Sequence, residues 1–320
     1  MPTTRLAPSP TGALHLGNAR TFLINWALAR QSGWRIVLRV EDLDTPRVKP
    51  GVLDLTVELL AWLGIDWDEG PQVQSAFRQH HVEAMGSLAR KGLVYPSDMT
   101  RREVEAAGAQ SAPNEGHHEV VFPASLRPVT VPNEFRDDHA AWRFATPDQS
   151  VSFTDLFTGP QTMHPARTIG DFVVWTRRDA AAPGQAAYQL AVVVDDARAG
   201  VTHVVRGDDL LDSAARQLRL YRALGLGPGP LHCHLPLVRG ADGKRLAKRH
   251  GDTRLDAYRS RGVSAERVIG LCAWWSGVQG MDGPVPMSAR EFLGRFSLDR
   301  VPHSDVVFTQ EDDAWLLRSV

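Results

Sequence analysis

The sequence predicts an α/β protein built on a parallel, doubly wound sheet. Short apolar runs, of the kind that form buried strands, alternate along the chain with stretches whose apolar residues recur at helical spacing. Several of these runs end in charged residues, as buried parallel strands do at the ligand-binding edge of an open sheet. An irregular stretch in the middle of the chain and a helical stretch at its end complete the predicted architecture.

The first twenty residues predict a short strand, a Pro/Gly loop and a helix. Arg5 and Leu6 belong to the strand, and Gly12 and Gly17 lie at the turn into the helix. The helix is predicted from apolar residues at helical spacing, namely Ala19, Phe22, Leu23, Trp26 and Ala27. Glycines let a backbone approach a ligand closely, and a helix N-terminus offers unpaired N–H groups to a phosphate. His15, just before the helix, is either an additional donor or an ordinary loop histidine.

The alternation continues over the next seventy residues. Residues 34–40 predict a β-branched strand, and Glu41 and Asp42 follow it at the edge where ligands bind. Amphipathic helices are predicted at 52–63 and at 76–89. Residues 1–94 are therefore predicted to form the first half of a Rossmann-type domain.

Residues 95–170 have a different character and predict an inserted α+β subdomain. Turn signals occur at 113–116 and 131–133, and the strand-like pieces at 142–145 and 151–157 are short. From residue 171 the α/β pattern resumes, and residues 171–240 are predicted to form the second half of the Rossmann domain.

Within that second half, three apolar runs predict buried strands. They cover 171–175, 188–194 and 204–210, and the second of them ends in Asp195 and Asp196. A helix at 211–224 and a short strand at 235–238 are predicted to follow. Residues 241–320 are predicted to form a basic loop and a mostly helical C-terminal region.

Composition restricts the classes of protein that are possible. A chain of 320 residues with 43% hydrophobic residues can bury a sizeable core, and its net charge of −1 does not by itself demand a nucleic-acid partner. Two cysteines do not make a disulfide framework, no apolar run is long enough to span a membrane, and no signal-peptide pattern is present. We therefore expect a cytoplasmic protein.

A second informative stretch is the loop from Gly243 to Gly251. It carries four cationic side chains within six residues and is flanked by glycines. Such a loop suits a polyphosphate, although a charge run of this kind is also typical of a solvated surface.

Together, these two stretches resemble the class I aminoacyl-tRNA synthetases, specifically their glutamyl branch. His15-Leu16-Gly17-Asn18 stands where the HIGH tetrapeptide of that class would be, with Asn18 in place of the second histidine. Residues 245–249, Arg-Leu-Ala-Lys-Arg, stand where the KMSKS motif would be, with Arg245 and Ala247 as departures and Lys248 retained. The resemblance covers residues 4 to about 253.

The resemblance implies a class I Rossmann fold and an adenylation reaction. His15, Gly17, Asn18 and Lys248 would bind ATP, with His15 and Lys248 as the catalytic residues and Mg²⁺ as the expected companion of the nucleotide. Lys248 would neutralise the charge that develops on the leaving pyrophosphate.

The resemblance also implies a glutamate pocket. Its residues would be Arg5, Ala7, Ser9, Glu41, Tyr188 and Arg206. A guanidinium can grip a carboxylate at two points, which suits the two arginines to the carboxylates of glutamate, whereas Glu41 suits its ammonium group. A purely structural alternative is that each arginine pairs with a nearby acid, such as Asp42 or Asp208.

Only about seventy residues follow Lys248, too few for the anticodon-binding region of full glutamyl- or glutaminyl-tRNA synthetases. This layout resembles the glutamyl-queuosine tRNA(Asp) synthetases, which attach glutamate to the queuosine base in the anticodon of tRNA(Asp). The implied partners are tRNA(Asp) bearing queuosine, L-glutamate and ATP, with the protein acting as a monomer.

One departure from the family concerns zinc. The family often carries a Cys-x-Cys pair in the insertion, but Ser97 and Met99 stand at those positions here. Neutral serine and methionine do not hold structural zinc, so we expect none. His117 and His118, with Asp98, are a weak alternative because adjacent histidines in a polar loop are usually solvated.

Three other functions remain open at this point. The chain could be a minimal glutamyl-tRNA synthetase that charges a tRNA 3′ end, or a nucleotidyltransferase of the wider HIGH superfamily. It could also be a regulator that binds tRNA or an amino acid without catalysis. His15 and Lys248 together argue against a pure binding protein.

Overall fold

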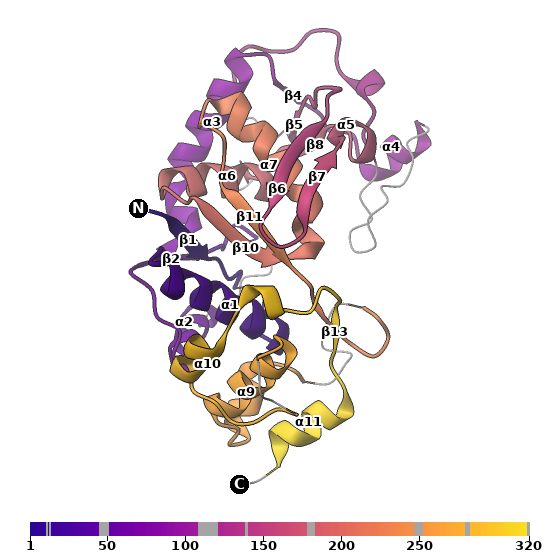
Figure 1. Ribbon diagram of the computed structural model, residues 1–320. Coiled ribbons are helices and arrows are strands. Elements are labelled where there is room, and N and C mark those ends of the chain that lie inside the picture. Colours follow the sequence, from indigo (N-terminus) through magenta and orange to yellow (C-terminus); the bar gives the residue numbers. More distant parts are fainter. Residues whose placement is uncertain are drawn as a thin grey trace.

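The computed structural model describes residues 1–10, 12, 14–44, 51–107, 121–137, 140–177, 183–244, 246, 252–278 and 282–318. Figure 1 shows these parts of the chain in three tiers, with an antiparallel sheet uppermost, parallel strands in the middle and the C-terminal helices below. No helix within these ranges combines the length and the apolar character needed to cross a membrane.

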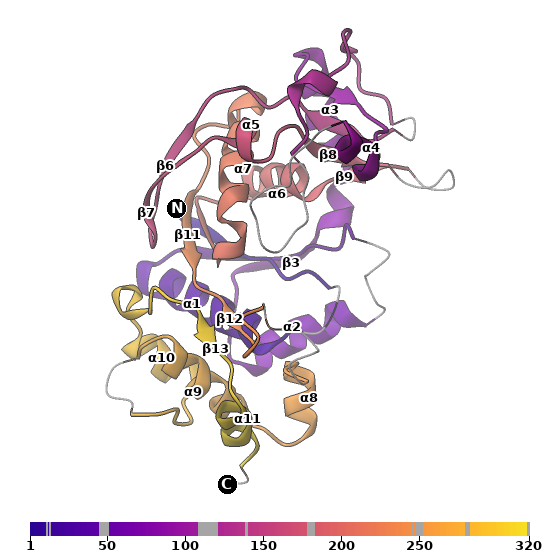
Figure 2. The same cartoon turned by 90° about the vertical axis from the view of Figure 1, so that its right-hand side faces the viewer.

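Parallel strands form the middle tier. β1 (Thr3–Leu6) pairs with β2 (Arg35–Val40) and β2 with β3 (Glu69–Val73), while β10 (His203–Gly207) pairs with β11 (Leu231–Leu235). In the turned view of Figure 2, β3 and β11 lie at the same middle level of the molecule. β1 also lies beside β10 (Figure 1), because the Thr202 backbone N–H donates to the Thr3 carbonyl oxygen at 2.9 Å. Strand order therefore reverses between β1 and β10, and open α/β sheets bind ligands at the carboxyl ends of strands at such a point.

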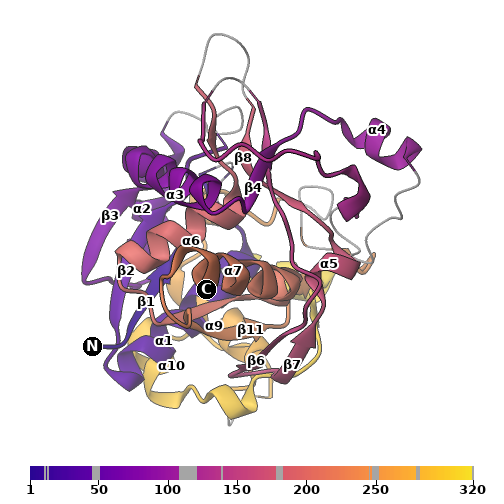
Figure 3. The same cartoon turned by 90° about the horizontal axis from the view of Figure 1, so that it is seen from above.

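Helices cover both faces of these strands (Figure 3). One face carries α1 (Leu16–Ser32), α2 (Val52–Trp62), α9 (Ala265–Trp275) and α10 (Ala289–Arg295), and the other carries α6 (Tyr188–Arg198) and α7 (Leu211–Leu224). Side chains alternate along a strand. As a result Leu6, Leu38 and Val205 join the core shared with α1 and α9. The arginines beside them, Arg5, Arg39 and Arg206, contact α6 and α7 instead.

The upper tier is an antiparallel sheet of β4 (Val94–Pro96), β5 (Trp142–Phe144), β8 (Phe172–Thr176) and β9 (Gln185–Ala186). α3 (Arg78–Arg90), α4 (Arg101–Ala106) and α5 (Pro165–Thr168) accompany it. The hairpin of β6 (Val151–Asp155) and β7 (Gly159–Met163) instead attaches to β11. β8 was expected to resume the parallel sheet at residue 171, but its antiparallel pairing shows that this sheet resumes only at β10.

The predicted strand at 188–194 is wrong, because these residues form the first part of α6. α6 is buried from Gln189 to Asp196 between α7 and the antiparallel sheet. A helix that is buried on all sides has no polar stripe, so its apolar run cannot be distinguished from a buried strand by periodicity. Asp195 and Asp196 therefore belong to a helix and not to a strand exit.

The C-terminal region is mostly helical, as predicted. It consists of α8 (Leu255–Ser260), α9, α10 and α11 (Gln310–Leu317), together with a parallel pair of β12 (Val238–Arg239) and β13 (Val306–Val307). Short 3-10 turns lie at Gln74–Phe77, Ala124–Leu126, Asp208–Leu210 and Leu298–Arg300. Arg20 of α1, which is 1% exposed, donates to the carbonyl oxygens of Pro236 and Trp275 and so ties this region to the Rossmann core.

Two helical glycines give a test of this packing. A Cβ added to Gly270 in α9 would lie 1.9 Å from the Val285 carbonyl oxygen, whereas one added to Gly86 in α3 would meet only the flexible end of Arg90 at 3.3 Å. We expect Gly270→Ala to lower the free energy of unfolding by about 1–3 kcal/mol through overpacking. The control Gly86→Ala should raise it by about 0.5–1 kcal/mol, because alanine favours helix. Urea unfolding measures both changes, and an unchanged Gly270→Ala protein would contradict the packing of α9.

Candidate functional site

His15 caps the N-terminus of α1. Its Nδ1 accepts a hydrogen bond from the Asn18 backbone N–H at 3.4 Å, and the Asn18 Oδ1 accepts from the His15 backbone N–H at 3.2 Å. Because Nδ1 is the acceptor, the neutral ring carries its proton on Nε2 and can donate from that nitrogen. A Cβ on Gly17 would lie 3.1 Å from His15 Cε1, so the absence of a side chain at Gly17 lets the ring lie over the helix end.

The loop with the basic motif is anchored next to His15. After the motif, the Thr253 carbonyl oxygen accepts from the Leu16 N–H at 3.1 Å, and His15 forms an antiparallel bridge with Arg254. Within the motif, Leu246 is buried in the core that includes α1, and its N–H donates to the Val238 carbonyl oxygen at 3.3 Å. Lys248, Arg245 and Ala247 lie outside the described residues, as do His117 and His118.

Arg5 and Arg39 share one carboxylate beneath α6. Arg5 Nε lies 3.5 Å from Asp196 Oδ2, and Arg39 Nη1 donates to Asp196 Oδ1 at 2.5 Å. Arg39 Nη2 also donates to Glu41 Oε1 at 3.0 Å. Burial lowers the pKa of Arg39, but Asp196 and Glu41 outweigh that effect and raise it above its ordinary value. Through Arg5 and Arg39, Asp196 connects the end of β2 to β1.

Arg5 does have an acidic partner, as the structural alternative expects, but this partner is Asp196 and not Asp42. Asp42 does not reach Arg5, because its carboxylate accepts hydrogen bonds from the backbone N–H and the hydroxyl of Ser75, at 2.8 and 2.6 Å. The acid that does pair with Arg5 lies on a helix that the sequence did not predict.

Arg206 differs from the other two arginines. It is 5% exposed, and its donors reach His234 Nε2 at 3.0 Å, Gln217 Oε1 at 2.9 Å and the Leu210 carbonyl oxygen at 3.1 Å. These acceptors are neutral, and among the described residues no carboxylate oxygen lies within 4.0 Å of its guanidinium. Burial lowers the pKa of Arg206 and the charge of Arg5 lowers it further, while Tyr188 and Asp196 only partly oppose this shift.

Tyr188 begins α6 and lies among the same groups. Although 39% of the residue is exposed, burial of its hydroxyl raises the pKa of Tyr188, and the charges of Arg206 and Arg5 oppose that shift while Glu41 adds to it. Arg5 Nη1 donates at 3.3 Å to the carbonyl oxygen of Val205, the residue that precedes Arg206. The structure therefore brings Arg5, Glu41, Tyr188 and Arg206 together at the reversal point of the strand order.

The remaining predicted residues lie on the loop between β1 and α1. Ala7 is partly buried and Ser9 is exposed. The loop is tied to the end of β2, because the Glu41 N–H donates to the Pro8 carbonyl oxygen at 2.9 Å.

Four residues of this site were missed in the sequence. Arg39, Asp155, Asp196 and His234 are all buried, and each makes a charged or ring hydrogen bond within the network. Arg39, Asp155 and His234 could have been noticed in the sequence, because each is a polar residue within an apolar strand pattern. Asp196 was recognised only as the end of a predicted strand, because its true position depends on α6 being a helix.

The residues at the expected zinc position do not fit that metal. Ser97 and Met99 offer no thiolate, and Met99 packs against the cluster of Tyr95, Val104 and Phe122. Within the described ranges, no group of three or more His, Cys, Asp or Glu residues is placed to hold a metal ion. Instead, Asp171 accepts from the Tyr95 hydroxyl at 2.6 Å and from Arg127 at 2.7 Å, which connects the strands of the insertion.

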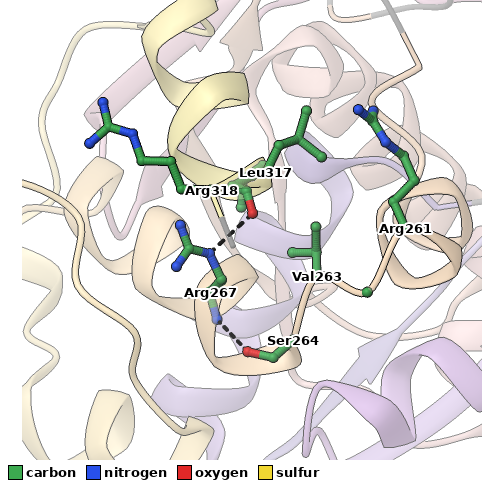
Figure 4. A pocket seen from close by; sticks show the side chains of 8 residues that line it. Arg261, Val263, Ser264, Arg267, Leu317 and Arg318 are labelled. Atoms are coloured by element: carbon green, nitrogen blue, oxygen red, sulfur yellow. Dashed lines mark hydrogen bonds between the residues drawn. The ribbon is translucent and has the colours of Figure 1, made fainter. Parts of the chain in front are cut away.

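A cavity of about 300 Å³ lies elsewhere, between the start of α9 and the end of α11 (Figure 4). Arg261, Arg267 and Arg318 line it. Arg267 Nε donates to the Leu316 carbonyl oxygen at 3.1 Å, and the same guanidinium donates to the Trp315 carbonyl oxygen. Arg267 therefore satisfies carbonyl groups at the end of α11, and the cavity includes none of the predicted site residues.

Comparison with known families accounts for this arrangement. The model of the catalytic domain of class I tRNA synthetases (E and Q) matches residues 2–312, and the chain therefore belongs to this family.

Individual relatives are more specific. The chain is 45% identical over 326 residues to the Glutamyl-Q tRNA(Asp) synthetase of Symbiobacterium thermophilum, covering 98% of this chain and 97% of that one. It is 38% identical to a glutamate–tRNA ligase of a Synechococcus species, but covers only 67% of that protein. The predicted resemblance to glutamyl-queuosine tRNA(Asp) synthetases is thereby confirmed.

The fold is shared with a crystal structure of a glutamate tRNA ligase from Elizabethkingia meningosepticum in complex with its amino acid. The TM-score is 0.76 at 26% identity, over 98% of this chain and 68% of that one. The predicted class I Rossmann fold is confirmed.

Proposed function

We propose that this enzyme activates L-glutamate with ATP as glutamyl-adenylate and transfers the glutamyl group to the queuosine base in the anticodon of tRNA(Asp). The observation that carries the proposal is the similarity to a Glutamyl-Q tRNA(Asp) synthetase along nearly the whole of both chains. The buried Arg206, which has no described carboxylate partner, supports the choice of an acidic substrate.

Glutamate would bind at the reversal point of the strand order. A cation that is buried without a counter-charge is costly, and a carboxylate of the substrate removes that cost. Arg206 and Arg5 would each bind a carboxylate, Glu41 the ammonium group, and Tyr188, Ser9 and the backbone of Ala7 would complete the pocket. Of these two carboxylates, the one that attacks ATP would lie next to the N-terminus of α1.

ATP would lie between His15 and the basic loop. The Gly17 N–H at the first turn of α1 and the Nε2–H of His15 would donate to the phosphates, and Asn18, whose backbone N–H is used by His15, would donate from its side-chain amide. The glutamate carboxylate oxygen attacks the α-phosphorus, the bond to pyrophosphate breaks, and Lys248 stabilises the charge on the leaving group. Mg²⁺ would accompany the phosphates, although no described carboxylate is assigned to it. The acyl group then passes to the RNA nucleophile and AMP leaves.

We infer that the protein acts as a monomer on tRNA. A minimal glutamyl-tRNA synthetase that charges a 3′ end would use the same adenylation site. The higher identity to the Glutamyl-Q tRNA(Asp) synthetase, 45% against 38% for the glutamate–tRNA ligase, favours the queuosine acceptor.

The acceptor is tested by transfer of labelled glutamate, with ATP, to tRNA(Asp) bearing queuosine or unmodified guanosine. We expect label only on the modified tRNA, and the label should survive removal of the 3′-terminal adenosine. Label on both tRNAs that is lost on this trimming would indicate a 3′-end synthetase. Absence of adenylate would refute the adenylation site itself.

Substitution of Arg206 tests the glutamate pocket. Arg206→Ala should weaken glutamate binding by about 100-fold or more, since breaking a buried charged pair costs about 3–5 kcal/mol. Arg219→Ala is the matched control, because Arg219 is a buried arginine of α7 that donates to the Gln149 and Ser150 carbonyl oxygens instead. Calorimetric titration with glutamate measures both. Equal affinities for the two variants would exclude Arg206 from the pocket.

Substitution of Lys248 tests the role of the basic loop. Lys248→Ala should slow glutamate-dependent ATP–pyrophosphate exchange by about 100- to 1,000-fold, because one charge-stabilising contact in the transition state is lost. Glutamate affinity should be unchanged. Lys244→Ala, a lysine at the start of the same loop, should keep nearly the full rate. Similar rates for the two variants would assign the effect to the charge of the loop as a whole.

A further inference from the structure

A histidine–aspartate pair lies behind Arg206. His234 Nε2 accepts from Arg206 Nε at 3.0 Å, and His234 Nδ1 lies 2.7 Å from Asp155 Oδ2. An arginine Nε can only donate, so His234 Nε2 must be the acceptor and Nδ1–H must donate to Asp155. The geometry therefore fixes the tautomer of His234 without reference to its titration.

Asp155 is itself held firmly. Its carboxylate also accepts from the backbone N–H groups of Phe157, Thr158 and His234 at 3.0, 2.9 and 3.2 Å. The side chains of Asp155 and His234 are completely buried. The three residues thus form a chain of hydrogen bonds from β6 through β11 to β10.

We propose that His234, oriented by Asp155, is a positioning residue that aims the Arg206 guanidinium at a carboxylate of the amino-acid substrate. The proposal rests on the proposed function, because it assumes that Arg206 binds glutamate. Neither His234 nor Asp155 needs to touch the substrate, since both act through Arg206.

The charge of each group explains why a histidine suits this position. A carboxylate in direct contact with Arg206 would orient it equally well, but would also neutralise it and compete with the substrate. A neutral imidazole orients the guanidinium and leaves its positive charge available. Burial lowers the pKa of His234, which favours the neutral ring. Burial alone would raise the pKa of Asp155, but the hydrogen bonds from His234 and from the Thr158 and Phe157 backbone N–H groups together outweigh it and lower that pKa to about 2.

The neighbouring His232 provides a comparison with His234, because its ring is buried but does not contact Arg206. His232 lies two residues earlier on β11 and stacks on His234, with ring centroids 5.7 Å apart and an angle of 7° between the planes. It is 2% exposed, and its Nε2 has no hydrogen-bond partner among the described residues. His232 and His234 therefore share strand, burial and ring type, but only His234 contacts Arg206.

The test compares His234→Leu with His232→Leu in glutamate-dependent ATP–pyrophosphate exchange. We expect His234→Leu to raise the KM for glutamate by about 10- to 100-fold, the usual effect of losing a hydrogen bond to a charged group, with the KM for ATP unchanged. His232→Leu should leave both KM values within about twofold. Exchange by the wild-type enzyme must be seen first, and its absence would refute the proposed function and not the role of His234.

A conservative variant keeps the test decisive if His234→Leu folds poorly. In His234→Gln the amide oxygen reaches the position of Nε2 and can accept from Arg206, so this variant should recover most of the glutamate KM. In His234→Asn the amide lies nearer the position of Nδ1 and should not. Equal glutamate KM values for the Gln and Asn variants, or equal effects on the KM for ATP and for glutamate, would overturn the positioning role.

Discussion

The structure depends on a layer of buried guanidinium groups on one face of the parallel strands. Arg5, Arg39 and Arg206 project from three strands towards α6 and α7, where apolar residues would ordinarily pack. Buried charges must be paired or hydrogen bonded. Asp196 meets this requirement for Arg5 and Arg39, and neutral acceptors meet only part of it for Arg206. The site is thus a place where the fold leaves one positive charge for a ligand to balance.

The same strands connect this layer to the nucleotide side of the site. The loop after β1 leads into the N-terminus of α1, and Thr4 and Arg5 are held to that helix by Asn25, whose amide accepts from the Thr4 hydroxyl and donates to the Arg5 carbonyl oxygen. Residues 253–255, just after the basic loop, pair with Leu14, His15 and Leu16. Residues far apart in the sequence therefore contact one short segment, the loop and helix start after β1. This explains why the first twenty residues are so informative about the function.

Most of the fold and part of the site could be predicted from the sequence. The strand–loop–helix at the N-terminus, α7 and the position of Arg5, Glu41 and Arg206 all followed from local patterns and from resemblance. α6 could not be predicted because a helix buried on all sides loses its amphipathic period. Asp196 was therefore placed on a strand exit, and its pairing with Arg5 and Arg39 was missed. Asp155 and His234 were missed because a tertiary pair from two separate strands leaves no spacing to recognise.

The position of Asp155 also changes how the predicted insertion relates to the pocket. β6 was assigned to an inserted subdomain, yet it pairs with β11 at the single register position of His232 and Asp155, and Asp155 contacts His234. Asp171, farther along the chain, accepts hydrogen bonds from Tyr95, Arg127 and the Thr146 backbone N–H. Hydrogen bonds at Asp155 and at Asp171 therefore attach the predicted insertion to the rest of the molecule. The geometry of Arg206 depends on Asp155, a residue that the sequence assigned to a different part of the molecule.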